Sequence, residues 1–478
     1  MGQRTAPRGA AGHGKGGDAA RRAAYDVLAA VEGRGAYANL LLAASLRERG
    51  LSGSDAALAT ELVYGTLRGR GSYDAVIGLC ADRGLDRIDP PVREVLRLGA
   101  HQLLGMRIKP YAAVATSVDL AAAVAGRRPA GFVNAVLRRV AAHDLESWIG
   151  IVAPDRAADP IGYLSVRYSH PRWIIEAIAD ALGEAGPGAG GLQPRGLTET
   201  EAALAADGQR PVVTVAAVPG LASRDELVAA GAQPARWSPV GGYLRHGDPG
   251  ALAAISEHRA GVQDEASQLA VFAMTRAPTT ADRAWLDLCA GPGGKARLLA
   301  GLAAERGAVL VAADAHQHRA RLTGQAIGMM SRARAVTADG TVPPWRAGTF
   351  DRVLADVPCS GLGSLRRRPE ARWRRGPADV AGLGPLQRRL LSAAIDSARS
   401  GGVVAYVTCS PHLAETREVI DDVLAERGGA QVIDAPALLG EVPDLRCPEP
   451  YGRYAQFWPH RHGTDAIFVA LLRRDGDR

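Results

Sequence analysis

From about Gly261 onward, the chain alternates between short apolar runs typical of buried strands and longer stretches with helical periodicity. The predicted strands are Arg283–Cys289, Ala308–Ala313, Ala333–Ala338, Phe350–Ala355 and Gly402–Thr408. The predicted helices between most of them are Gly294–Glu305, His316–Met330 and Leu386–Ala398. Such alternation requires crossover helices between parallel strands, so residues 261–474 are expected to form an α/β domain with a mostly parallel sheet. Ala466–Arg473 is expected to be a last strand, in an antiparallel hairpin with a strand ending at Trp458.

The chain ahead of this domain has different patterns, and a length of 478 residues suggests several domains. Residues 19–145 carry apolar positions at helical spacing, punctuated by Gly50, Gly84 and Gly126, and predict a small all-α domain. Residues 146–260 mix short helix-like and strand-like stretches, which indicates a linker and a small α+β middle domain. Residues 1–18 are polar, basic and Gly-rich, and are expected to be a disordered tail.

The amino-acid composition indicates the class of protein and the cellular compartment to expect. Apolar residues make up 47% and charged residues 22% of the chain, which is typical of globular proteins, and no apolar run has the ~20 residues of a membrane span. The first residues lack the apolar core of a secretory signal, so a cytoplasmic location without membrane attachment is expected. The five cysteines include no Cys-x-x-Cys pair or zinc-type cluster, which predicts reduced thiols and no metal site. We expect a monomer.

The first predicted strand of the α/β domain ends in D-L-C-A-G-P-G-G-K, Asp287 to Lys295. Glycines at this position let the backbone approach a ligand closely, as nucleotide-type cofactors require. Asp314 closes the next strand, where a carboxylate can accept both hydroxyls of a ribose. The loop matches neither the dinucleotide pattern G-x-G-x-x-G nor the Walker pattern, whereas S-adenosylmethionine fits a glycine turn with several acids. Asp339, after the third strand, is a further such acid.

Two cysteines follow two later strands of the same predicted sheet. Cys359 stands three residues after Asp356 in A-D-V-P-C-S-G, and Cys409 follows the next strand in Y-V-T-C-S. A thiolate that adds to C6 of a pyrimidine activates C5 as a carbon nucleophile, and a second group must then help to release the product. Asp356 is placed to hydrogen-bond the cytosine ring nitrogen and amino group as charge develops. The residues predict methylation of pyrimidine C5, and by themselves they leave open which cysteine attacks.

Basic residues cluster near these cysteines and in the helical domain. The stretch L-R-R-R-P-E-A-R-W-R-R interleaves arginines with an aromatic ring, a combination suited to a phosphate backbone and a stacked base. The candidate RNA contacts there are Arg366, Arg367, Arg368, Arg372 and Trp373. Arg138 and Arg139, beside the apolar stripe of the last predicted helix of the all-α domain, are candidates as well. The formal net charge of +7 agrees with a polyanionic partner.

These motifs resemble the Sun family of RNA (cytosine-5)-methyltransferases over nearly the whole chain. The similar stretches are D-L-C-A-G-P-G-G-K, D-V-P-C-S-G-L-G-S-L-R-R-R-P-E-A-R-W, Y-V-T-C-S-P, Q-D-E-A-S-Q-L (Gln263–Leu269) and W-P-H-R-H-G-T-D (Trp458–Asp465). The amino-terminal part resembles a NusB-like RNA-binding domain, through E-L-V-Y-G-T-L-R (Glu61–Arg68), L-G-A-H-Q-L-L (Leu98–Leu104) and F-V-N-A-V-L-R-R (Phe132–Arg139). The combination is similar to the bacterial branch that acts on 16S ribosomal RNA, with a Rossmann-like methyltransferase domain.

The resemblance implies a role for each matching residue. It makes Cys409 the nucleophile, assigns product release to Cys359, and implies 16S ribosomal RNA as the partner. The implied contacts to S-adenosylmethionine are Cys289, Ala290, Gly291, Pro292, Gly293, Gly294, Lys295, Asp314, Asp339 and Asp356. One departure is Glu415-Thr416-Arg417, which stands where relatives often have E-N-E.

Three other functions are compatible with parts of the sequence. The same chemistry could act on tRNA or on another ribosomal RNA. The helical domain alone suggests a noncatalytic RNA-binding factor of the antitermination type. A nicotinamide-dependent oxidoreductase would share the glycine turn and the ribose acid, but it leaves the paired cysteines and the arginines unexplained.

Overall fold

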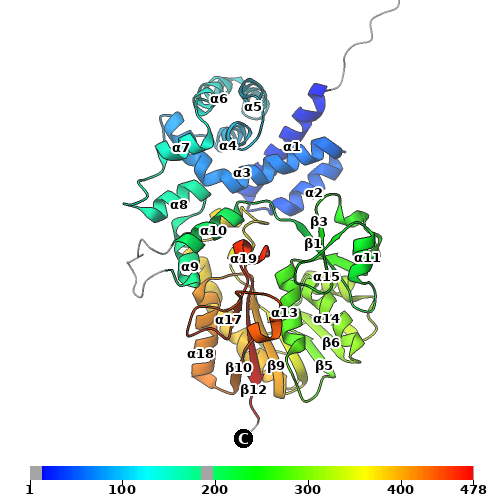
Figure 1. The fold of residues 1–478 in the computed structure, drawn as a ribbon. Coiled ribbons are helices and arrows are strands. Elements are labelled where there is room, and N and C mark those ends of the chain that lie inside the picture. Colours follow the sequence, from blue (N-terminus) through cyan, green and yellow to red (C-terminus); the bar gives the residue numbers. More distant parts are fainter. Residues whose placement is uncertain (1–12, 185–196, 477–478) are drawn as a thin grey trace, which may run out of the picture. The chain divides into compact units, whose positions relative to one another are not determined.

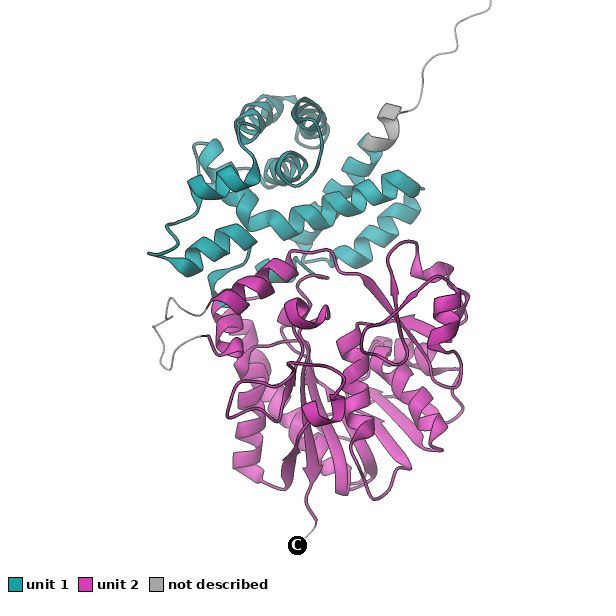
Figure 2. Ribbon diagram, viewed as in Figure 1, with its two compact units in different colours: residues 1–175, 368–374 teal, residues 176–367, 375–478 magenta. Residues whose placement is uncertain are grey.

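The computed structural model describes residues 13–184 and 197–476 (Figure 1). The chain divides into two compact units, coloured separately in Figure 2. Unit 1 comprises residues 1–175 and 368–374, and unit 2 comprises residues 176–367 and 375–478. Residues 1–12 of the predicted tail, which spans residues 1–18, lie outside the described residues. The first helix begins at His13.

Unit 1 is helical, as the spacing of its apolar residues predicts. Its helices are α1 (His13–Arg34), α2 (Ala38–Glu48), α3 (Gly53–Cys80), η1 (Leu85–Arg87), α4 (Pro90–Leu104), α5 (Pro110–Ala125), α6 (Arg127–Val140), α7 (Leu145–Val152) and α8 (Pro160–Tyr168). Prolines open α4 and α5, where the missing amide hydrogen costs nothing. The stripe of Val133, Val136 and Leu137 on α6 is buried in the common core. In the described residues, no helix has the length and apolar character needed to cross a membrane.

A short segment from much later in the chain completes unit 1. Residues 368–374, which include α16 (Ala371–Arg374), pack among the amino-terminal helices. The guanidinium of Arg372 is fully buried and donates to the carbonyl oxygen of Arg68 at 3.0 Å. The Trp373 ring lies against Gly71, where an added Cβ would come within 2.8 Å of it. The helical fold therefore uses a piece of chain that the sequence places between two strands of the α/β domain.

Unit 2 begins with α9 (Arg172–Leu182), which starts in unit 1, and contains a small antiparallel sheet in the order β2-β3-β1-β4. The elements of this part are α10 (Thr198–Asp207), β1 (Val213–Ala217), α11 (Arg224–Ala229), β2 (Gln233–Pro234), β3 (Gly241–Leu244), η2 (Pro249–Ala251), α12 (Ala253–Ser256) and β4 (Ala260–Val262). The carboxylate of Glu265, at the start of α13 (Glu265–Arg276), accepts hydrogen bonds from the amides of Trp237 and Ser238 at 2.6 and 2.7 Å. These bonds fasten the small sheet to the helix that follows it.

The large sheet of unit 2 has the strand order β10-β12-β9-β8-β5-β6-β7, with β11 paired to β12. Its strands are β5 (Ala284–Asp287), β6 (Val309–Asp314), β7 (Ala333–Thr337), β8 (Phe350–Asp356), β9 (Ala398–Thr408), β10 (Ala430–Ile433), β11 (Ala455–Gln456) and β12 (Phe468–Arg474). The helices are α14 (Gly294–Glu305), α15 (Gln317–Ile327), η3 (Leu362–Ser364), α17 (Pro377–Ser397), η4 (Leu413–Glu415), α18 (Arg417–Arg427), η5 (Pro436–Leu439) and α19 (Pro459–His462). Strands β5 to β9 are parallel, and β12 runs antiparallel to both β9 and β11, which confirms the predicted sheet.

The topology gathers the predicted chemical groups at one edge of the large sheet. Strand β5 pairs with β6 on one side and with β8 on the other, so the direction of winding reverses between β5 and β8. Ligands of open α/β sheets bind beyond the carboxyl ends of the strands at such a reversal. Asp287, Asp314, Asp356 and Cys409 stand at the carboxyl ends of β5, β6, β8 and β9, respectively.

Candidate active site

The glycine loop after β5 is held by backbone contacts to the neighbouring strand. The amide of Ala290 donates to the carbonyl oxygen of Ala313, and the amide of Gly291 donates to Asp314 Oδ2 at 3.1 Å. Gly293 has φ +107°, and a Cβ there would lie 2.7 Å from the Cβ of Ala326. Only glycine fits this close turn, after which α14 begins at Gly294.

Asp314 is buried at the end of β6 and already orients the loops around it. Its Oδ1 accepts from the amide of His316 at 2.9 Å, and its Oδ2 lies 3.3 Å from Arg319 Nε. Arg319 in turn donates to the carbonyl oxygen of Gly291. The carboxylate is therefore fixed beside the glycine loop, in the position expected of a carboxylate that accepts hydrogen bonds from a ribose.

Three charged groups meet at the reversal point between β5 and β8. Lys295 Nζ lies 2.8 Å from Asp356 Oδ2. Burial lowers the pKa of Lys295, but the ion pair with Asp356 outweighs it, so the pKa is raised on balance. Asp287 is fully buried, and no side chain donates a hydrogen bond to either of its oxygens. Burial and the nearby charge of Asp356 raise the pKa of Asp287 to about 8.

The two predicted cysteines come together at the ends of adjacent strands. The Sγ atoms of Cys359 and Cys409 are 3.1 Å apart, within hydrogen-bond distance, and all five cysteines of the chain are thiols. The hydrogen bond to Cys409 and burial raise the pKa of Cys359 well above its ordinary value. Either sulfur can be the donor in this contact, and the raised pKa disfavours the thiolate form of Cys359. Burial likewise raises the pKa of Cys289.

A buried carboxylate that was given no role from the sequence supports this pair. Glu415 accepts hydrogen bonds from the amide of Ser360 at 2.7 Å and from Gln387 Nε2 at 3.2 Å, and its second oxygen bonds the Ser360 hydroxyl. Ser360 follows Cys359 directly, and its hydroxyl lies 3.2 Å from that of Ser410, which follows Cys409. The only signal in the sequence is that residues 415–417 stand where relatives often have E-N-E and depart from it, which marks the position without explaining it.

Asp339 lies beyond β7 at the same edge of the sheet and is exposed. Its Oδ1 accepts from the amide and the hydroxyl of Thr341, both at 2.8 Å. These two bonds lower the pKa of Asp339 and hold its carboxylate in a turn.

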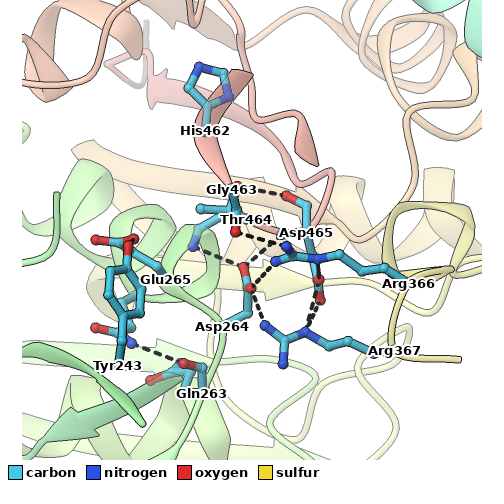
Figure 3. A network of polar contacts seen from close by, with 12 residues as sticks. Tyr243, Gln263, Asp264, Glu265, Arg366, Arg367, His462, Gly463, Thr464 and Asp465 are labelled. Carbon is cyan, nitrogen blue, oxygen red and sulfur yellow. Dashed lines mark hydrogen bonds and ion pairs between the residues drawn. The ribbon is translucent and has the colours of Figure 1, made fainter. Parts of the chain in front are cut away.

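The arginines after Cys359 have partners inside the protein. Arg366 and Arg367 form ion pairs with Asp264 and Asp465 (Figure 3). Arg366 is 7% exposed and Arg372 is 0% exposed, so the prediction that these two side chains contact RNA is wrong. In a sequence, a run of arginines suggests side chains exposed to solvent. Here the folded chain pairs the buried arginines with carboxylates and carbonyl oxygens.

The side chains of the other predicted RNA contacts are exposed or partly exposed to solvent. Arg368 is exposed and lies over the ring of Tyr37, while Arg367 and Trp373 are partly buried. Arg138 and Arg139 are exposed on α6, and Arg139 pairs with Asp82. RNA binding by these five residues stays a prediction.

Comparison with known proteins agrees with the fold. The profile of the family described as 16S rRNA methyltransferase RsmB/F matches residues 273–473, and that of the NusB family matches residues 18–142. Rv1407 of Mycobacterium tuberculosis is named as a methyltransferase. It is 50% identical to this chain, over 96% of this chain and 97% of its own length. Ribosomal RNA small subunit methyltransferase B of Pseudomonas putida is 31% identical over 95% of this chain and 98% of its own.

Solved structures show the same fold. The crystal structure of PH0851 has a TM-score of 0.75 with 20% identity, covering 97% of this chain and 100% of that one. NSun6 from Pyrococcus horikoshii, solved with SFG, has a TM-score of 0.51 with 19% identity, covering 64% of this chain and 99% of that one. Fold and site thus define a methyltransferase with a Rossmann-like catalytic domain and a NusB-type helical domain. The chain belongs to the RsmB/F family of 16S rRNA methyltransferases.

Proposed function

We propose that this methyltransferase uses S-adenosylmethionine to methylate C5 of a cytosine in 16S ribosomal RNA, through a covalent adduct between Cys409 and C6. The observation that carries the proposal is the pair of thiols, 3.1 Å apart, at the ends of strands β8 and β9. A methyltransferase of exocyclic amines has no use for two thiols at this place, whereas C5 chemistry needs one to attack and one to help release.

The residues around the glycine loop fit the cofactor. The backbone at Gly291 and Gly293 leaves no room for a side chain, and Asp314 offers a carboxylate at the end of β6. The residues that would hold it are those from Cys289 to Lys295, with Asp314, Asp339 and Asp356. When bound, S-adenosylmethionine supplies an electrophilic methyl group.

In the proposed reaction the Cys409 thiolate forms a bond to C6 of the cytosine. The electron pair of the C5–C6 double bond is thereby displaced toward C5 and the ring carbonyl, and Asp356 hydrogen-bonds the polar edge of the base. After C5 has gained its methyl group, the C5 proton passes to water, and the electron pair of the C5–H bond re-forms the C5–C6 double bond as the Cys409–C6 bond breaks. Cys409 leaves as a thiolate, and Cys359 assists this release. The base must be flipped or unpaired, because a thiol cannot reach C6 within a stack.

Cysteine substitutions test the mechanism. We expect Cys409→Ser to abolish transfer of labelled methyl groups to 16S ribosomal RNA, and Cys359→Ala to accumulate a protein–RNA adduct that survives denaturing gel electrophoresis. Full turnover by the Cys409→Ser variant would refute the assignment of the nucleophile. Bisulfite mapping of ribosomal RNA from cells lacking the protein identifies the target cytosine.

The substrate proposal is supported by the relatives, since the Pseudomonas putida protein is named for the small-subunit ribosomal RNA. Methylation of tRNA or of another ribosomal RNA is the alternative outcome of the mapping. Membership of a methyltransferase family excludes the oxidoreductase and the purely noncatalytic factor. We propose further that the protein acts as a monomer in the cytoplasm and that the exposed arginines of α6 contact the RNA.

A further inference from the structure

Four charged side chains form a buried cluster close to the thiols, here called the Asp–Arg quartet: Asp264, Arg366, Arg367 and Asp465 (Figure 3). Arg367 Nη2 lies 2.6 Å from Asp264 Oδ2, and its Nε lies 2.9 Å from Asp465 Oδ1. Arg366 repeats the pattern, with Nη2 at 3.1 Å from Asp264 and Nε at 2.9 Å from Asp465. Each guanidinium therefore bridges both carboxylates.

The quartet is balanced in charge and shielded from water. The side chains of Asp264, Asp465 and Arg366 are 7%, 8% and 9% exposed, and that of Arg367 is 23% exposed. Burying ions is unfavourable unless they are paired and hydrogen-bonded, and removing one member leaves an uncompensated charge. Asp264 also accepts from the amides of Ala266 and Asp465, so the start of α13 and the approach to β12 are joined here.

Two backbone hydrogen bonds link the quartet to the nucleophile. The amide of Ala466, next to Asp465, donates to the carbonyl oxygen of Gly363 at 2.8 Å, and the amide of Gly363 donates to the carbonyl oxygen of Cys409 at 2.8 Å. A Cβ on Gly363 would lie 1.9 Å from the oxygen of Ala466. Gly363 also lies in the loop that starts with Cys359 and ends with Arg366 and Arg367. The contacts thus run continuously from Asp465 to both thiol-bearing segments.

We propose that Asp465 and Asp264 are positioning residues for methyl transfer. By fixing Arg366 and Arg367 they hold Gly363 against Cys409, and this contact keeps the two Sγ atoms at their working separation. The bonds that join the quartet to Cys409 run through Ala466 and Gly363, so the quartet acts through the backbone of the loop. The inference rests on the proposed function, in which Cys409 is the nucleophile.

Asp465→Asn tests this inference, because it removes one charge with almost no change in shape. We expect kcat to fall by about 10- to 100-fold, the effect of a displacement on the order of 1 Å in an active site, while KM for 16S ribosomal RNA changes by less than about twofold. In a Cys359→Ala background, the rate of covalent adduct formation with RNA falls by the same factor. Arg367→Lys keeps the positive charge but loses the Nε contact to Asp465, and the same loss is expected there, which covers the case in which Asp465→Asn does not fold.

Asp434→Asn is the matched control, since Asp434 forms an exposed ion pair with Arg446 at 3.0 Å in the same unit, away from these contacts. Its adduct rate should equal that of the parent. A merely structural quartet would lower the melting temperature and leave the adduct rate of the folded Asp465→Asn protein unchanged, which would overturn the inference. Absence of any adduct in the Cys359→Ala parent would instead count against the proposed function.

Discussion

Asp287 lies in an environment that its position in the sequence does not predict. It follows three apolar-strand positions and is fully buried, with Asp356, Lys295 and Asp314 as the charged groups near it. Burial first, and then the charge of Asp356, raise its pKa from 3.8 to about 8. At neutral pH the carboxyl is therefore protonated in the folded protein and ionised in the unfolded chain.

This difference makes folding depend on pH. Because the unfolded chain releases the proton at a lower pH than the folded protein, the stability contributed by the neutral form is complete below pH 3.8 and is lost as pH rises to about 8. We predict that the melting temperature without cofactor falls more steeply between pH 5 and 8 in the parent protein than in Asp287→Asn. Differential scanning calorimetry at several pH values measures both slopes, and equal slopes would contradict the prediction.

At the scale of single residues, the sequence was informative where a motif sits at a strand end. Asp314, Asp356, Cys359 and Cys409 could be placed at one edge because parallel strands share their carboxyl ends. Glu415 and Asp465 could not be assigned a role in this way. Their function depends on partners 55 and 99 residues away, and a single sequence carries no trace of such pairing.

Among the elements, the turn between β5 and α14 places a strict conformational requirement on one of its residues. Gly293 has φ +107°, which L side chains rarely adopt, and an added Cβ would also meet Thr323 Cα at 3.0 Å. The next glycine, Gly294, has open space at its Cβ position and begins the helix. The two adjacent glycines therefore differ in what they tolerate.

We predict that Gly293→Ala lowers the free energy of unfolding by about 2 kcal/mol, since a left-handed conformation at a non-glycine residue costs roughly 1–2 kcal/mol before the steric clash is added. Gly294→Ala is the matched control and should leave stability unchanged or slightly higher, because alanine favours a helix. Urea denaturation of the cofactor-free proteins measures both. Equal stability of the two variants would show that the turn relaxes.

The order of the strands and helices of unit 2 follows from periodicity, but some boundaries do not. Helix α17 starts at Pro377, nine residues before the predicted start at Leu386, and it contains Pro385 in its interior. The sequence pattern does not predict strand β10, which is only four residues long and pairs only with β12 at the edge of the sheet. Edge strands bury little surface, so their pattern is weak.

Unit 1 as a whole depends on a segment that the sequence assigns to another domain. Trp373 lies beside Gly71 and 5.6 Å from the guanidinium of Arg70, and Glu370 accepts from the amide of Ala38. The arginine-rich stretch predicts RNA binding, because nothing in a single sequence shows that part of the stretch completes a helical core.

We predict that Trp373→Ala destabilises unit 1 by about 2 kcal/mol, less than the ~3–5 kcal/mol of a fully buried aromatic residue because the ring is only partly buried. Hydrogen exchange should accelerate in α3 around Gly71 and remain unchanged in β8. Arg375→Ala, just after the segment, is the control and should alter neither region. Unchanged protection of α3 in the Trp373 variant would mean that the ring contributes little to the fold.

Because residues 368–374 belong to the helical unit, the protein has no single point at which its gene can be divided into two self-sufficient halves. A fragment ending near residue 175 would lack Arg372 and Trp373. If the first 175 codons were exchanged with those of a relative, each helical core would have to pack against the other protein's version of residues 368–374. Recombination between genes is therefore disfavoured within this chain, and its two units are expected to be inherited together.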